Sequence, residues 1–154
     1  MTRGALLRTG AAGAVLLALG GCAPAASPDA MLRAVAATML DGALPTAGYD
    51  AALDAAVDGV RTAIAGLPPA VQGEIAQLFG LLEFPLTRRV LAGVGPWDRA
   101  RRGDVAAFLQ RWRTSNVALL RSGYQALHQL VMAGWYGQNA AWPRIGYPGP
   151  PHIA

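Results

Sequence analysis

The sequence has one cysteine, two histidines and no lysine among its 154 residues. A single cysteine cannot form a disulfide within the chain, and His128 and His152 do not have the spacing of a metal-binding pair. Only 14% of the residues are charged, whereas 53% are hydrophobic, and this composition is not that of a disordered chain. We therefore expect one folded domain that holds no zinc or iron-sulfur centre.

All thirteen basic residues are arginine, and the sequence pI is about 10.0. Two of them, Arg3 and Arg8, fall in the expected leader of residues 1–22, which leaves eleven arginines against nine acidic residues, a net charge of +2. These arginines form no dense basic stripe of the kind that binds phosphate backbones, so we predict no nucleic-acid partner.

Motifs for nucleotide binding and for nucleophilic catalysis are missing from the sequence. There is no G-x-G-x-x-G after a strand, no G-x-x-x-x-G-K-[ST] and no G-x-S-x-G. Asp50, Asp54 and Asp58 recur every four residues, but like charges at that spacing favour a solvated helix face. His128 has no evident carboxylate to orient it as a base. We predict that the chain is not an enzyme and has no catalytic, cofactor-binding or metal-binding residue.

Residues 1–22, "MTRGALLRTGAAGAVLLALGGC", have the pattern of an export leader, with Arg3 and Arg8 ahead of an apolar segment too short to span a bilayer. Two cleavage sites compete. The sequence Leu-Gly-Gly-Cys at 19–22 resembles a bacterial lipobox, which would make Cys22 the acylated first residue. Alternatively, Ala-Pro-Ala at 23–25 suits ordinary signal peptidase, which would discard Cys22. The first alternative is favoured and predicts an exported periplasmic lipoprotein anchored to a membrane surface.

Residues 23–28 form a short linker, and a helical bundle is expected over 29–140. Prolines and glycines mark helices over 28–40 and 49–65, a third from Pro69, and a short fourth after Pro85. Apolar residues recur at helical spacing in the first three: Met31, Val35 and Met39; Leu53, Val57, Val60 and Ile64; Val71, Ile75, Leu78, Phe79 and Leu82. No stretch alternates with a period of two, so we predict an all-α bundle of about five helices.

The longest helical region is expected over 104–136, with a break near Ser115 and Asn116. Its apolar positions are Val105, Phe108, Leu109 and Trp112 in the first part and Leu119, Leu120, Leu127, Leu130 and Val131 in the second. Gly123 and Gly134 lie on the same stripe and predict the close approach of another helix. Residues 141–154, "AWPRIGYPGPPHIA", are rich in proline and glycine and predict an extended, non-helical C-terminal tail.

Aromatic residues and arginines gather in the second half of the sequence, as they do at protein interfaces. For Trp112 and Tyr124, core packing is the favoured interpretation because they share helical faces with aliphatic residues. Trp142 and Tyr147 are stronger candidates, since they sit in the proline-rich tail. The complete set of candidate partner-binding residues is Trp112, Arg113, Tyr124, Trp135, Tyr136, Trp142, Tyr147, Pro148 and Pro150.

Three segments resemble a known family: "AGLPPAVQGEIAQLFGLL" (65–82), "FLQRWRTSNVALLRSGYQALHQLVMAGWYG" (108–137) and "AWPRIGYPGPP" (141–151). They are similar to the small subunits of bacterial periplasmic FAD-dependent dehydrogenases, which include the third subunit of gluconate 2-dehydrogenase and the small subunits of sorbitol, fructose and glucose dehydrogenases. The ending "WYG…W…GYPGPP" is the most specific element. The resemblance extends over about 31–151.

This resemblance implies a non-catalytic accessory subunit of an oxidoreductase complex. Such a subunit binds a large flavin-carrying dehydrogenase, helps it mature and localises it, while a cytochrome c or another acceptor takes the electrons. FAD is then expected in the partner and no cofactor in this chain. The alternative from the residues alone is a free-standing helical periplasmic lipoprotein with a structural or ligand-carrying role.

Overall fold

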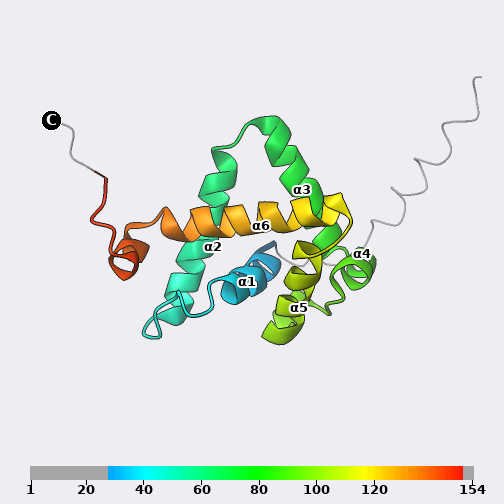
Figure 1. Ribbon diagram of the computed structural model, residues 1–154, viewed down its shortest axis with the longest axis horizontal. Helices are drawn as coiled ribbons and strands as arrows, with labels where there is room; N and C mark the ends of the chain where they lie inside the picture. The colour runs from blue at the N-terminus through cyan, green and yellow to red at the C-terminus, as the bar shows by residue number, and fades with distance from the viewer. Residues whose placement is uncertain (1–27, 151–154) are drawn as a thin grey trace, which may run out of the picture.

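The computed structural model describes residues 28–150, and within this range all regular structure is helical. The all-α prediction is therefore confirmed (Figure 1). The leader, Cys22 and both cleavage sites lie outside the described residues and remain predictions. The elements are α1 (Pro28–Met39), α2 (Tyr49–Ala65), α3 (Pro69–Glu83), α4 (Pro85–Thr87), the π-helical turn η1 (Arg88–Ala92), the 3-10 turn η2 (Trp97–Arg99), α5 (Arg102–Arg113), α6 (Ala118–Tyr136) and the 3-10 segment η3 (Asn139–Ile145).

The long C-terminal helical region is broken where the sequence predicts. Helix α5 ends at Arg113 and α6 begins at Ala118. At the break, the Thr114 hydroxyl donates to the Gln110 carbonyl (2.9 Å) and the Val117 amide donates to the Ser115 hydroxyl (3.1 Å). Such short polar side chains compete with helical hydrogen bonds, which allows the chain to turn back so that α6 packs against α5.

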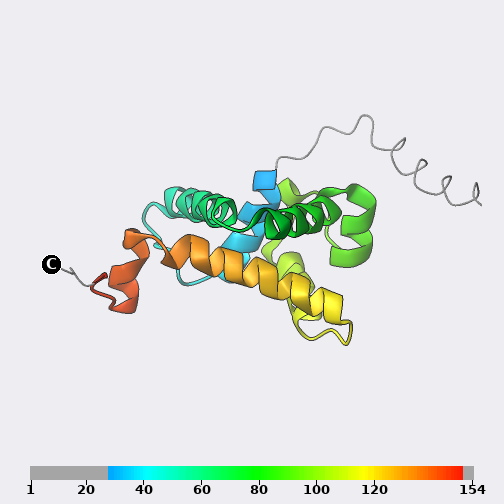
Figure 2. The ribbon, with the colours of Figure 1, turned by 90° about the horizontal axis from the view of Figure 1, so that it is seen from above.

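Helix α6 crosses α2, and this is the most extensive helix pair in the described part of the molecule (Figures 1 and 2). Gly59 of α2 and Gly134 of α6 meet at the crossing. A Cβ atom on Gly134 would lie 2.6 Å from the Val60 nitrogen and 2.7 Å from the Ala56 carbonyl oxygen, so the two backbones approach too closely for any larger residue. The close helix approach predicted at Gly134 is confirmed.

The core lies between α1, α2, α5 and α6. Its largest fully buried side chains include Met31, Leu40, Phe108 and Leu127. The ring of Phe108 packs edge-on against Trp112, with ring centroids 4.9 Å apart, and it also contacts Trp97 at 6.1 Å. Offset and edge-to-face aromatic pairs of this kind add to the stabilisation from burial.

Ion pairs cover the outer side of α1 and α2. Arg33 pairs with Asp50 and Asp54, and Arg61 pairs with Asp29 and Asp58. The three aspartates of α2 are exposed, which confirms the predicted solvated helix face. Because these pairs are open to water, each contributes little to stability.

Two apolar residues predicted to be buried are not. Val71 of α3 is 38% exposed and Leu119 of α6 is 76% exposed. Both positions satisfy the helical spacing of a buried stripe, but α3 packs on α1 and on the π-helical turn instead of closing against α6. A gap therefore remains between α3 and α6.

The C-terminal tail differs from the predicted extended chain, since residues 139–145 form a 3-10 segment that includes Pro143. Proline has no amide hydrogen to donate, but its carbonyl accepts a hydrogen bond from the Gly146 amide (3.4 Å), and the Tyr147 amide donates to the Trp142 carbonyl (3.0 Å). Successive short turns therefore tolerate a proline that an α-helix interior would not.

Candidate partner-binding groove

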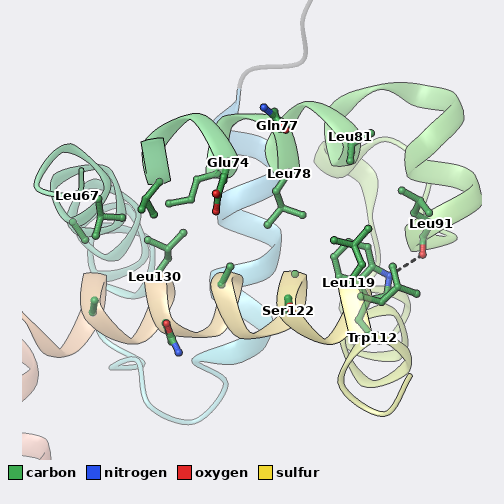
Figure 3. A pocket seen from close by; sticks show the side chains of 18 residues that line it. Leu67, Glu74, Gln77, Leu78, Leu81, Leu91, Trp112, Leu119, Ser122 and Leu130 are labelled. Atoms are coloured by element: carbon green, nitrogen blue, oxygen red, sulfur yellow. Dashed lines mark hydrogen bonds between the residues drawn. The ribbon is translucent and has the colours of Figure 1, made fainter. Parts of the chain in front are cut away.

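A groove of about 690 Å³ lies between α3 and α6, and we call it the α3–α6 groove (Figure 3). Its α3 wall includes Val71, Leu78 and Leu81, and its α6 wall includes Leu119 and Leu130. Leu78 points from α3 into the gap, and Leu130 points into it from α6 at a position nearer the start of α3. The groove remains open because α3 and α6 do not pack directly against each other along these apolar side chains.

One stripe of α6 lines the groove from end to end. Its residues recur at intervals of three and four, namely Leu119, Ser122, Ala126, Gln129 and Ala133. A neighbouring stripe of the same helix, which includes Leu127, Val131 and Gly134, is buried in the core. Helix α6 thus has a buried apolar face and a second, mixed face that the described chain leaves uncovered, in which Ser122 and Gln129 alternate with Leu119 and the alanines.

The end of the groove near α5 is held by side-chain hydrogen bonds to backbone carbonyls. The Trp112 indole nitrogen donates to the Leu91 carbonyl (3.0 Å), and the Arg111 guanidinium donates to the Ala92 carbonyl (2.5 Å). The Trp97 indole donates to the Leu82 carbonyl at the end of α3 (2.8 Å). Carbonyls at a helix end lack intrahelical partners, so these donors satisfy groups that would otherwise be unpaired.

Trp112 also forms part of the groove floor. A Cβ atom on Gly123 would lie 2.6 Å from the Trp112 ring, so the glycine leaves room for the indole to lie close against α6. This contact couples α5 to α6 directly beneath the groove. The predicted close approach at Gly123 is therefore made by a tryptophan side chain and not by a helix backbone.

Charge is distributed unevenly around the groove. The Glu74 carboxylate hangs from α3 into the gap (Figure 3), and among residues 28–150 it has no hydrogen-bond or ion-pair partner. Beyond α6, Arg113 and Arg121 line a shallow depression that shares Ser122, Ala126 and Gln129 with the groove. An occupant would therefore meet a carboxylate on the α3 side and guanidinium groups beyond α6.

A second acidic residue, Glu83, lies at the end of α3. Burial, and next the nearby Asp29 carboxylate, raise the pKa of Glu83 above its ordinary value. Its Oε1 atom is buried without a hydrogen-bond partner in the described chain. Arg88 is also buried, and it donates to the Glu83 carbonyl at 3.3 Å.

The candidate partner-binding residues do not form one surface. Trp135 is buried in the core and cannot contact a partner directly, which corrects its place in the predicted set. Trp112 is also buried, so the core-packing interpretation holds for it, although its ring reaches the groove floor. Tyr124 is half-buried beside His128, with ring centroids 5.8 Å apart. Arg113 is exposed at the depression beyond α6.

The structure brings the remaining candidates together at the C-terminal end of α6. The half-buried Trp142 donates its indole hydrogen to the Tyr136 carbonyl (3.1 Å) and packs edge-on against Tyr147, with ring centroids 5.2 Å apart. Tyr147, Pro148 and Pro150 are exposed. The tail therefore docks on its own helix through Trp142 and leaves Tyr147 facing solvent. This cluster and the groove end near Trp112 are separated by the length of α6, about 28 Å for 19 residues.

Sequence reasoning did not find the α3–α6 groove. The available signal was an excess of apolar residues beyond a single stripe on α3 and at the start of α6, including Val71, Leu81 and Leu119. Within residues 28–150, no helix has the length and apolar character needed to cross a bilayer, and no three His, Cys, Asp or Glu side chains gather as a possible metal site. Comparison of the chain with models of protein families, curated proteins and solved structures found no match.

Proposed function

We propose that this chain is the non-catalytic small subunit of an exported FAD-dependent dehydrogenase of the glucose-methanol-choline oxidoreductase type. It binds the flavoprotein, helps it mature and holds it at its site of action. The proposal combines the sequence resemblance of the segments 65–82, 108–137 and 141–151 with the presence of an accessible apolar surface on the folded chain.

The observation that carries the proposal is the number of large apolar side chains that remain exposed around the groove. Leu81 and Leu119 line it, and the adjoining chain segments carry others, namely Phe84, Leu86 and Val117. Extended exposed apolar surfaces are uncommon on proteins that act alone and are typical of interaction sites. A binding subunit accounts for this surface better than a free-standing bundle does.

Purification from the native host tests the proposal. A tagged full chain should recover a flavoprotein in fixed stoichiometry, detected by the flavin absorbance bands and by dehydrogenase activity with an artificial acceptor. The same chain purified alone should show no flavin spectrum. Recovery of the chain free of any flavoprotein, from cells that express dehydrogenase activity, would contradict the proposal.

The proposed membrane tether is tested separately, because it depends on Cys22 alone. Cys22→Ala should leave unprocessed precursor or release the protein from the membrane fraction, since no thiol remains to be acylated. A variant that fractionates like the wild type would favour cleavage after Ala25.

A second candidate function is that of a free-standing ligand carrier, and the groove volume supports it. At about 690 Å³ the groove is within the range of small-molecule sites. This candidate predicts a stable monomer or homo-oligomer that purifies with a bound apolar compound, which mass spectrometry of the extracted protein would detect.

A further inference from the structure

We infer that the α3–α6 groove takes an amphipathic α-helix of the partner, one that carries a lysine or arginine at the edge of its apolar stripe to meet Glu74. That this helix belongs to the flavoprotein rests on the function proposed above. The inference follows from the lining of the groove, its length and the position of one carboxylate.

The lining determines which backbone conformation an occupant can have. The walls are mainly aliphatic side chains, with Leu78 and Leu81 on α3 and Leu119 and Leu130 on α6. They offer few groups to hydrogen-bond an occupant's amides and carbonyls. An extended peptide would leave its backbone unpaired on that surface, whereas a helix satisfies its own backbone hydrogen bonds. A helix is therefore the favoured occupant.

The shape of the groove also suits a helix. Helices α3 and α6 run antiparallel on its two sides, as the order of the labelled residues in Figure 3 shows. A third helix can lay its ridges into the trough between two such walls. The α3 residues that line the groove run from Val71 to Leu81, a span of about 16 Å, which corresponds to roughly three turns of the occupant.

The charge of Glu74 discriminates between a basic helix and an anionic lipid as the occupant of the groove. Its carboxylate projects into a mainly apolar gap and has no partner among the described residues. A fatty acid would bring a second negative charge toward it, which costs free energy, whereas a lysine or arginine on the occupant would pair with it. Within the groove lining, where Glu74 is the charged residue, the charge therefore favours a basic amphipathic helix over an anionic lipid, and the guanidinium groups of Arg113 and Arg121 lie in the separate depression beyond α6.

Two synthetic peptides test the inference on the purified full chain. Both are 18-residue helices with the same leucine stripe; one has lysines along one flank and the other has glutamines. We expect the lysine peptide to bind about fivefold more tightly by titration calorimetry, and we expect Glu74→Gln to abolish that difference. Equal binding of the two peptides, or a difference that persists in Glu74→Gln, overturns the charged part of the inference.

A matched pair of substitutions locates the binding site. Leu119 lines the groove and is 76% exposed, whereas Val90 lies outside it and is 75% exposed. We expect Leu119→Glu to weaken the lysine peptide at least tenfold and Val90→Glu to change its affinity less than twofold, with the helical circular dichroism of both variants unchanged. Equal effects of the two variants overturn the groove as the site. Saturable binding of palmitate without binding of either peptide, or self-association that Leu119→Glu abolishes, also overturns it.

Recovery of the flavoprotein with the same two variants separates this inference from the proposed function. If the flavoprotein is recovered equally with Leu119→Glu and Val90→Glu, the groove inference fails and the proposed function stands. If the lysine peptide binds in the groove but no flavoprotein is recovered with the wild-type chain, the proposed function fails and the groove remains a helix-binding site.

Discussion

The buried face and the groove face of helix α6 differ in what covers them. The buried face, with Leu127, Val131 and Gly134, packs against α2 and the core. The groove face, with Leu119 and Ala126, looks across a gap toward α3. At the buried face, the glycine pair Gly59 and Gly134 lets two backbones approach closely, while at the groove face a gap separates Leu119 and Ala126 from the α3 wall. Close helix packing in this chain thus occurs where glycines face each other, and a groove remains where it does not occur.

The buried face of α6, where it crosses α2, should be more sensitive to substitution than the groove face. Gly134→Ala places a Cβ atom against the backbone of α2, which cannot move aside as a side chain can, so we expect a loss of about 2–3 kcal/mol in the free energy of unfolding. Urea unfolding followed by circular dichroism measures it.

Gly73→Ala is the matched control for this prediction. Gly73 lies in α3 with nothing within 4 Å of an added Cβ, so the same substitution should stabilise the chain by about 0.5–1 kcal/mol. If both glycines respond alike, the close packing at the crossing is not what distinguishes the two faces.

Two substitutions in the C-terminal tail test how much the tail stabilises the fold. Trp142→Ala removes a half-buried ring and the indole that donates to the Tyr136 carbonyl, and we expect a loss of about 2 kcal/mol in the free energy of unfolding. Tyr147→Ala removes an exposed ring from the same cluster and should cost less than 1 kcal/mol. Similar losses for the two variants would show that the exposed Tyr147 ring stabilises the tail as much as the half-buried Trp142 does.

Removing the whole tail separates folding from partner binding. Deletion of residues 142–154 should keep the helical circular dichroism, because the helices α1 to α6 all precede it. If Tyr147 anchors the flavoprotein, the deletion should also lower its affinity roughly thirtyfold. An unfolded deletion variant would make the tail part of the core, and a fully active complex would place partner binding on the helices alone.

A larger side chain in the groove should bury part of the groove face of α6 and block peptide binding. Ala126→Leu extends an apolar side chain into the gap, so we expect the isolated chain to gain about 1 kcal/mol in stability while binding of the lysine peptide falls at least tenfold. Ala76→Leu, on the exposed side of α3 and outside the groove lining, is the control and should change neither. A stabilised variant that still binds the peptide would place binding elsewhere.

The smallest expected effect concerns Glu83 at the end of α3. Because burial raises its pKa, the folded chain holds this proton more tightly than the unfolded chain. The resulting stabilisation is present below the ordinary pKa of 4.5 and is lost as the pH rises through the raised value. Glu83→Gln should therefore flatten the stability profile just above pH 4.5 and raise stability at pH 7 by a fraction of a kcal/mol. A stability profile that keeps its slope in Glu83→Gln would assign the pH dependence to other groups.

Helical periodicity predicted the covered parts of the molecule well. The bounds of α2, the break near Ser115 and the close approach at Gly134 all follow from apolar spacing and from glycine and proline positions. These features are local or depend on one stripe of one helix.

The groove could not be predicted in the same way. Spacing identifies Val71 and Leu119 as members of apolar stripes, but it cannot say whether another element of the same chain covers them. The tail was mistaken for extended chain because Pro143 excludes an α-helix, although it allows the shorter turns of a 3-10 segment. Both differences arise from packing between distant segments.

The hydrogen bonds from Trp97, Arg111 and Trp112 to backbone carbonyls have a kinetic consequence. They fix the end of the α3–α6 groove before any partner arrives. Binding of a partner helix therefore requires no prior conformational change at this end of the groove. Association should proceed in one phase, with a rate constant of about 10⁵–10⁷ M⁻¹s⁻¹, as is usual for rigid docking. Variation in affinity among partners would then appear almost entirely as variation in how long the complex lasts.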